Sequence, residues 1–260
     1  MLASLAARLP LNLSRQDRLS GALIVMWVAS MISLPILRWV GGDPIVPTGV
    51  AITVIVQSAA VASVLARAWG WQRTLLTLVA VAALGWLIEF IGSTTGLPFG
   101  QYHYTDRLQP QINGVPLVIP FAWFMMLPPA WAVAHRLIGV KRRLAFVALS
   151  ALAFTAWDLF LDPQMVGWGF WVWADPNGYF GIPWINFGGW ITASAVITLL
   201  VQPSKLPVRP LLIIYTITWA LMTIGLLVFW GLPGPALAGG AAMGTLVALA
   251  WRAELRGETV

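Results

Sequence analysis

The chain contains no cysteine and few charged residues, and each shortage excludes a class of protein. Without cysteine there can be no disulfide, no thiolate metal site and no cysteine nucleophile. Charged residues make up about a quarter of a typical soluble domain. Here they make up only 9% of 260 residues, while 59% are hydrophobic and the mean hydropathy is +0.82. The composition therefore predicts a single integral membrane domain over residues 1–260, built as an all-α, polytopic helix bundle.

Long apolar runs set the number of membrane crossings. A transmembrane helix needs about 20 largely apolar residues, and eight stretches meet this requirement. They are approximately 21–40, 49–68, 74–92, 115–135, 144–161, 184–202, 209–230 and 233–251. We therefore expect about eight transmembrane helices.

The basic residues alternate between the connections. Of the 15 lysines and arginines, all but Arg38 and Arg107 lie in the N-terminal segment, the 67–73, 136–143 and 205–209 loops, or the C-terminal segment. By the positive-inside rule, this distribution predicts a multi-pass protein of the cell (inner) membrane with both termini in the cytoplasm. The protein's net charge of +6 comes from these basic connections, so we expect the lipid bilayer as a partner and no nucleic acid. No small-residue cleavage site follows the first long apolar run, so no signal peptide is expected.

Two segments share one pattern of residues, 86–123 and 155–190. Each contains an acid, Glu89 or Asp158, and a Gly-x-aromatic-x-aromatic box whose glycine follows eleven residues later in both copies, while the loop after the box differs in length by two residues. Each copy is completed by a Gly-[Val/Ile]-Pro turn and by a tryptophan that lies seven residues after the proline of that turn. We interpret the pair as a parallel internal repeat of two helical hairpins, which builds one site from two half-sites at the repeat interface. Chance similarity between aromatic-rich loops is the alternative.

Acidic residues within apolar spans are costly and usually functional. Only Glu89, Asp158 and Asp162 lie in or at the edge of the predicted spans. Asp158 and Asp162 are four residues apart and share a helix face, and Pro163 predicts that this helix ends at Asp162. Carboxyls sharing a low-dielectric site cannot all ionise, so one would act as an acid and a neighbour as a base. The alternative is that Glu89 or Asp162 caps or bridges helices.

The aromatic boxes, Tyr102/Tyr104 and Trp171/Trp173, have a spacing of two. Alternate residues of an extended segment point the same way, so each pair can present two rings to one cavity. An aromatic belt at the headgroup level is the alternative. His103, between the two tyrosines, is expected at the surface. It lies on the opposite side of the membrane from His135, so no metal site is expected, and no histidine is placed to form a nucleophilic triad.

At this point the residues resemble a known family, the membrane-integral carotenoid biosynthesis proteins, which include γ-carotene 1′,2′-hydratases and bisanhydrobacterioruberin hydratases. The resemblance covers approximately residues 86–190. In the first hairpin it rests on Glu89-x-x-Gly92, Gly96-x-Pro98-Phe99-Gly100-x-Tyr102-x-Tyr104, Gly114-x-Pro116 and Pro120-x-x-Trp123. In the second it rests on Trp157-Asp158, Asp162-Pro163, Trp171-x-Trp173, Tyr179-x-Gly181-Ile182-Pro183 and Asn186-x-x-Gly189-Trp190.

The resemblance implies cofactor-free addition of water across the terminal C1′=C2′ bond of an acyclic carotenoid end. The substrate would be of the lycopene, γ-carotene or bisanhydrobacterioruberin type, and the product a tertiary alcohol. Asp158 is the expected proton donor, with Glu89 and Asp162 orienting water and tuning the acid. The expected substrate-binding residues are Tyr102, Tyr104, Trp157, Trp171, Trp173, Tyr179, Asn186 and Trp190. A non-catalytic carotenoid or lipid carrier, a proton-coupled transporter, and a scaffold for other carotenoid enzymes are the alternatives.

Overall fold

The computed structural model describes residues 14–256, and the predicted helix bundle is confirmed there. Eight helical segments of this part of the chain are long and apolar enough to cross a membrane, so the protein is a multi-pass membrane protein. The helices are α1 (Arg15–Gly41), α2 (Val46–Trp69), α3 (Trp71–Thr95), α4 (Val118–Leu137), α5 (Arg143–Gly167), α6 (Trp184–Val201), α7 (Val208–Ile224) and α8 (Pro233–Leu255). A short 3-10 helix, η2 (Asp43–Ile45), joins α1 to α2.

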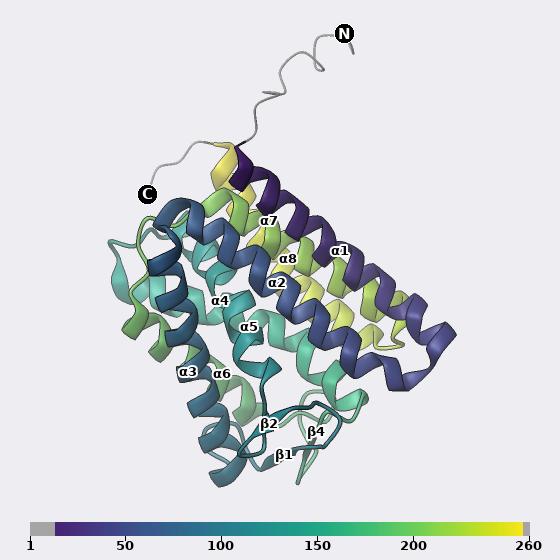
Figure 1. Cartoon of the computed structure of the whole chain (residues 1–260). Helices are drawn as coiled ribbons and strands as arrows, with labels where there is room; N and C mark the ends of the chain where they lie inside the picture. The colour runs from purple at the N-terminus through teal and green to yellow at the C-terminus, as the bar shows by residue number, and fades with distance from the viewer. Residues whose placement is uncertain (1–13, 257–260) are drawn as a thin grey trace.

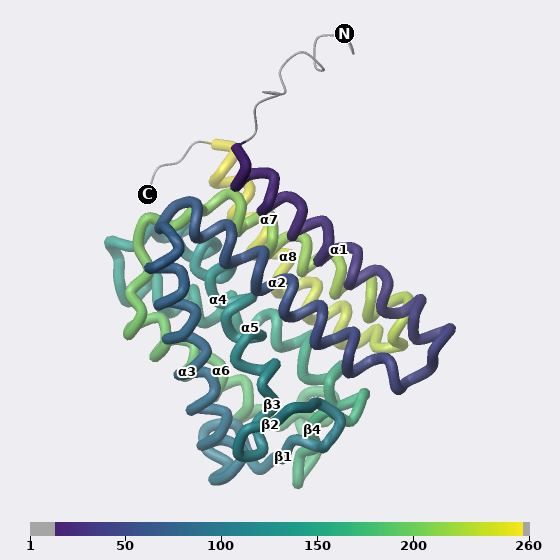
Figure 2. The backbone as a smooth tube through the Cα atoms, viewed as in Figure 1, coloured from purple at the N-terminus to yellow at the C-terminus, as the bar shows by residue number. Residues whose placement is uncertain are grey.

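The helices run up and down, so alternate connections lie at opposite ends of the bundle. The start of α1 and the end of α8 lie at one end, and the short strands lie at the other (Figure 1). The backbone tube in Figure 2 shows the two long loops, between α3 and α4 and between α5 and α6, gathered at that second end. The chain ends themselves, for which a cytoplasmic location is predicted, lie outside the described residues.

The two aromatic boxes are extended and pair with each other. β1 (Tyr102–Tyr104) and β4 (Trp171–Trp173) form a two-stranded antiparallel sheet in which Tyr102 is opposite Trp173 and Tyr104 opposite Trp171. A two-fold axis through the middle of this pair exchanges Tyr102 with Trp171 and Tyr104 with Trp173. Those are the pairs that the proposed repeat treats as equivalent. A second small pair, β2 (Gln111–Ile112) with β3 (Val115–Pro116), closes the first loop.

Equivalent tryptophans of the two hairpins also meet. Trp123 on α4 and Trp190 on α6 stack with their ring centroids 5.1 Å apart and an interplanar angle of 10°. Phe154 on α5 packs beside both rings. The interface between the hairpins is therefore an aromatic core, and α4 is the most deeply buried of the helices that could span a membrane.

The predicted end of α5 at Asp162 is wrong, because the helix continues through Pro163 to Gly167. A proline inside a helix cannot donate to the carbonyl four residues earlier, here that of Leu159. The Tyr179 hydroxyl donates to this Leu159 carbonyl at 3.0 Å. Because the freed acceptor has a partner, the helix tolerates Pro163, and Asp162 stays on the same helical face as Asp158.

Candidate active site

Glu89 is the centre of the first half of the site. It lies on α3 and is buried, and three side chains converge on its carboxyl group. The Tyr102 and Tyr104 hydroxyls donate to Oε2 at 2.6 and 2.8 Å, and Trp123 Nε1 donates to Oε1 at 3.0 Å. All three are donors, so the arrangement suits an acceptor carboxylate. This geometry gives the two tyrosines a definite task, since they hold Glu89 as well as lining a cavity.

The two tyrosines remain donors over a wide pH range. Burial, and secondly the nearby Glu89, raise the pKa of Tyr102 and of Tyr104 well above 10. Burial, and secondly Asp158, raise the pKa of Tyr179 to about 12. These phenols are therefore protonated at neutral pH, and each hydroxyl keeps its hydrogen for the bond described above.

Asp158 and Asp162 form the second half of the site and share one donor. Both are fully or almost fully buried on α5. The Asn186 amide on α6 donates to Asp158 Oδ2 at 3.1 Å and also to Asp162 Oδ2. Trp171 Nε1 donates to Asp162 Oδ1 at 3.1 Å, whereas Asp158 Oδ1 is buried and has no hydrogen-bond partner. Two carboxyl groups with so few donors between them favour sharing a proton.

A small cavity lies between the two halves. Its volume is about 30 Å³, and it is lined from α3, β1, α4, α5, β4 and α6. Both Glu89 and Asp162 reach it, whereas Asp158 lines neither this cavity nor the larger one described next. The lining residues are Glu89, Phe99, Tyr102, Tyr104, Ile119, Ala122, Trp123, Leu161, Asp162, Trp171, Trp173, Asn186 and Trp190. This volume is enough for a water molecule among several polar groups.

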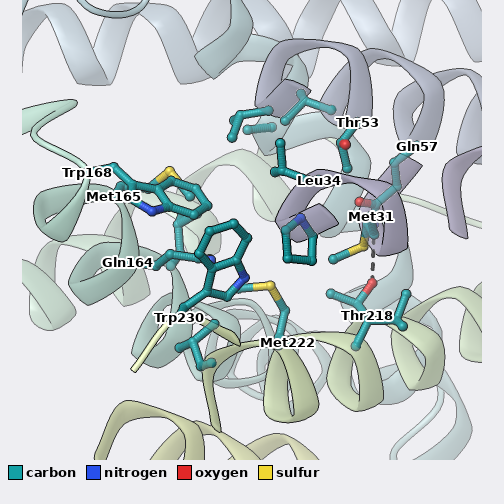
Figure 3. Close-up of a pocket in the computed structure, with 18 of the residues that line it drawn as sticks. Met31, Leu34, Thr53, Gln57, Gln164, Met165, Trp168, Thr218, Met222 and Trp230 are labelled. Atoms are coloured by element: carbon teal, nitrogen blue, oxygen red, sulfur yellow. Dashed lines mark hydrogen bonds between the residues drawn. The ribbon is translucent and has the colours of Figure 1, made fainter. Parts of the chain in front are cut away.

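A larger, almost wholly apolar cavity of about 490 Å³ adjoins the small one (Figure 3). The two cavities share four lining residues, Ile119, Ala122, Leu161 and Trp171. Trp157 lines the larger cavity, which extends between α1, α2 and α7. The site therefore joins a chamber of water size, lined in part by carboxyl groups, to an apolar chamber of ligand size.

Most of the predicted site residues line the small cavity, and the exceptions are Asp158, Trp157 and Tyr179. Tyr102, Tyr104, Trp171, Trp173, Asn186 and Trp190 line the small cavity with Glu89 and Asp162. Tyr179 lines neither cavity and instead partners the Leu159 carbonyl. His103 is exposed, as expected for a surface histidine. Among residues 14–256, no three histidine, aspartate or glutamate side chains gather as a metal centre would require.

Sequence reasoning missed two parts of the site. The repeat pattern contains Trp123 but does not predict its hydrogen bond to Glu89, and the matched spacing of Trp123 and Trp190 is the signal that could have found it. The large cavity was missed altogether, because its walls come largely from α1, α2 and α7. These helices look like uniform apolar spans, and no local pattern marks where such helices leave space between them.

Glycines of the two hairpins hold one aromatic ring between them. A Cβ added to Gly92 on α3 would lie 2.5 Å from the Phe99 ring, and one added to Gly189 on α6 would lie 2.6 Å from it. Phe99 in turn packs edge-on against Tyr102, with ring centroids 6.2 Å apart. The glycines of the Glu-x-x-Gly and Asn-x-x-Gly motifs thus permit a close approach that positions a Glu89 donor.

Fold and site together define a polytopic α-helical membrane protein with buried carboxyl groups beside an apolar, ligand-sized cavity. The model of the carotenoid biosynthesis protein family matches residues 49–249, and the chain belongs to that family. The chain is similar to the bisanhydrobacterioruberin hydratase of Haloarcula japonica, with 34% identity over 132 residues. That match spans 50% of this chain and 45% of the relative, so less than half of the relative's length is covered. No solved structure matches the chain.

Proposed function

We propose that this protein is a carotenoid hydratase, which adds water across the terminal C1′=C2′ double bond of an acyclic carotenoid end. The observation that carries the proposal is the junction of two cavities, a small one of water size that Glu89, Asp162 and Asn186 line, and an apolar one of ligand size. A hydration needs a water molecule and an alkene to meet beside an acid. The similarity to a bisanhydrobacterioruberin hydratase supports the same reaction class.

The first chemical step is protonation of the alkene. Asp162 is the acid in this mechanism, because Asp162 lines the small cavity whereas Asp158 does not. Asp158 shares the proton with Asp162, and the Asn186 amide, which donates to both carboxyl groups, holds them in fixed positions relative to each other. The proton goes to C2′, and the alkene electrons form the new C–H bond, which leaves a tertiary cation at C1′. This proposal replaces the expected donor, Asp158, with Asp162.

The cation then needs an electron-rich wall. Trp157 and Trp171 line the apolar cavity, and Trp171 also lines the small one. Ring faces attract a desolvated cation by up to about 2 kcal/mol each. The buried Glu89 carboxylate supplies a negative charge on the other side of the small cavity.

Water captures the cation in the second step. The water oxygen forms a bond to C1′ while Glu89 accepts one of its protons, giving a tertiary alcohol. In this mechanism Trp173 Nε1 orients the water, and its support is that this buried donor has no hydrogen-bond partner while Trp173 lines the small cavity together with Glu89. The proton on Glu89 then returns to the aspartate pair through the cavity, so the protein is restored and the net change is addition of one water.

The substrate in this proposal is a carotenoid of the lycopene, γ-carotene or bisanhydrobacterioruberin type, and no cofactor takes part. Its end group lies near the outer face of the cell membrane, because the strands are at the end of the bundle opposite the basic connections and both termini are cytoplasmic in this topology.

The test is expression of the chain in cells that make lycopene or γ-carotene, followed by mass analysis of the pigments. A hydratase yields a new pigment heavier than its precursor by one water. A carrier or a scaffold leaves the pigment masses unchanged, and that result in cells that contain the folded protein contradicts the proposal.

A further inference from the structure

We propose that the carotenoid enters sideways from the bilayer, through an opening between α1 and the end of α7, and keeps its chain in that opening during the reaction. This inference rests on the proposed function, and it assigns the large cavity as a binding tunnel for a linear polyene. The tunnel begins at the lipid-facing surface and ends at the acids.

The inner end of the tunnel is fixed by shared walls. Ile119, Ala122 and Leu161 line both the large cavity and the small one that Glu89 and Asp162 reach, as does Trp171. A linear chain lying in the large cavity can therefore place its terminal group beside the small cavity, which Asp162 and Glu89 line.

The outer end is marked by residues that line the cavity and yet are exposed. On α1 these are Ile32, Ile36 and Trp39, and across from them Ile224 and Phe229. All five are apolar and lie in helices that could span a membrane. Their exposed surface therefore faces lipid, which is the phase that holds a carotenoid.

Both helices that flank the opening depart from regular α-helix beside it. Pro35 lies inside α1 and lines the cavity. α7 continues into a π-helical turn, Gly225–Phe229, several residues of which also line the cavity. Proline removes a helical hydrogen bond, and π-helical turns are frequent at functional sites. Figure 3 shows Leu34 of α1, Met222 of α7 and Trp230, just beyond the π-turn, pointing toward one another around the cavity.

Aromatic contacts close the rim at the strand end of the opening. Trp39 and Phe229 contact each other across the two helices, with ring centroids 5.8 Å apart. Arg38 lies over the Trp230 ring at 5.4 Å and pairs with Asp43 at 2.6 Å. The rim is thus polar and aromatic on the outside, while the opening below it is apolar, so a hydrocarbon chain enters from the membrane and not from water.

The absence of cysteine makes a clean test available, because any introduced thiol is unique. Ile36→Cys places a thiol on a cavity-lining side chain that is 50% exposed. Leu37→Cys is the matched control, because Leu37 is the next residue in the sequence and is 44% exposed but does not line the cavity. Each variant is reacted to completion with a bulky maleimide in purified, detergent-solubilised protein, and two quantities are measured: the rate of hydration and the amount of polyene retained on repurification.

The expected result is that labelling lowers both hydration and pigment retention of Ile36→Cys at least tenfold relative to the same variant before labelling, whereas labelling Leu37→Cys causes no such loss. Full activity and pigment retention in completely labelled Ile36→Cys would overturn the tunnel. The two proposals fail separately: a protein that retains polyene only when position 36 is unlabelled, yet never hydrates it, supports the tunnel and contradicts the hydratase.

Discussion

The two hairpins share a frame of residues but differ in how they treat their acids. In the first, Glu89 receives three hydrogen bonds from Tyr102, Tyr104 and Trp123. In the second, Asp158 and Asp162 share the Asn186 amide, and one oxygen of Asp158 has no partner. Three donor groups serve one carboxyl group in the first hairpin, whereas two donor groups, Asn186 and Trp171, serve two carboxyl groups in the second.

In the proposed mechanism this difference corresponds to opposite tasks for the acids of the two hairpins. A carboxylate rich in donors is stabilised as an acceptor, and it suits the base that takes a proton from water. Two carboxyl groups poor in donors hold a proton between them, and they suit the acid. The strand register and the stacked Trp123 and Trp190 fit a two-fold relation between the hairpins. On this interpretation the asymmetry is what makes a hydration site from a symmetric frame.

Removing the acid is expected to have the largest effect. We expect Asp162→Asn to lower the hydration rate by about 10² to 10⁴-fold, the usual range for a general acid. Asp158→Asn should lower it less, because Asp162 keeps its place on the cavity wall. The rates are measured from the pigment masses in producing cells at equal protein levels.

The control for the Asp158 and Asp162 variants is Asp106→Asn, which makes the same substitution at an exposed aspartate in the loop between α3 and α4. It should hydrate at the wild-type rate. A greater loss in Asp158→Asn than in Asp162→Asn would transfer the donor role to Asp158, and wild-type activity in both would remove the aspartate pair from the mechanism.

Replacing the base comes next. Glu89→Gln is expected to lower the hydration rate by about 10²-fold, because an amide neither accepts the proton from water nor balances the cation. Its NH2 group would also face donors from the tyrosines or Trp123, which costs about 1–3 kcal/mol of folding free energy. Ser93→Ala, one turn further along α3, is the matched control, because the Ser93 hydroxyl donates only to the Phe90 carbonyl of its own helix. Equal activity in both variants would contradict the role of Glu89.

A single donor to Glu89 should matter less. Tyr102→Phe removes one of the two hydroxyls on Oε2 and is expected to lower activity about tenfold, since a hydrogen bond to a charged group contributes roughly 1.5–3 kcal/mol. Because the pKa of Tyr102 is raised well above 10, the folded protein retains a proton that the unfolded chain releases above pH 10. Stability should therefore fall as pH rises above about 10, and it should fall less steeply in Tyr102→Phe. Denaturant titrations at several pH values measure this slope, and identical slopes in the two proteins would exclude the buried phenol as its source.

Much of this arrangement follows from local sequence. The eight spans follow from apolar run length, and the extended aromatic boxes from the spacing of two. The acids stand out because charge is rare in these spans. The continuation of α5 past Pro163 could not be predicted, because it depends on a hydroxyl from Tyr179, sixteen residues further along the chain. The large cavity depends on how α1 and α7 pack, which no short stretch of sequence records.

The smallest expected effect concerns the ring that links the hairpins. Gly189→Ala would bring its Cβ 2.6 Å from the Phe99 ring and 2.8 Å from the Pro98 carbonyl oxygen, and the backbone there cannot rotate away as a flexible side chain could. We expect a loss of about 1–3 kcal/mol in stability from this overpacking, and a fall in activity of less than tenfold as Phe99 shifts Tyr102. Gly188→Ala is the matched control, since nothing lies within 4 Å of its added Cβ. It should raise stability by about 0.5–1 kcal/mol, because alanine favours a helix over glycine. Thermal unfolding measures both variants side by side. If the two alanines act alike, the packing of Phe99 between the hairpins does not position the Glu89 half of the site.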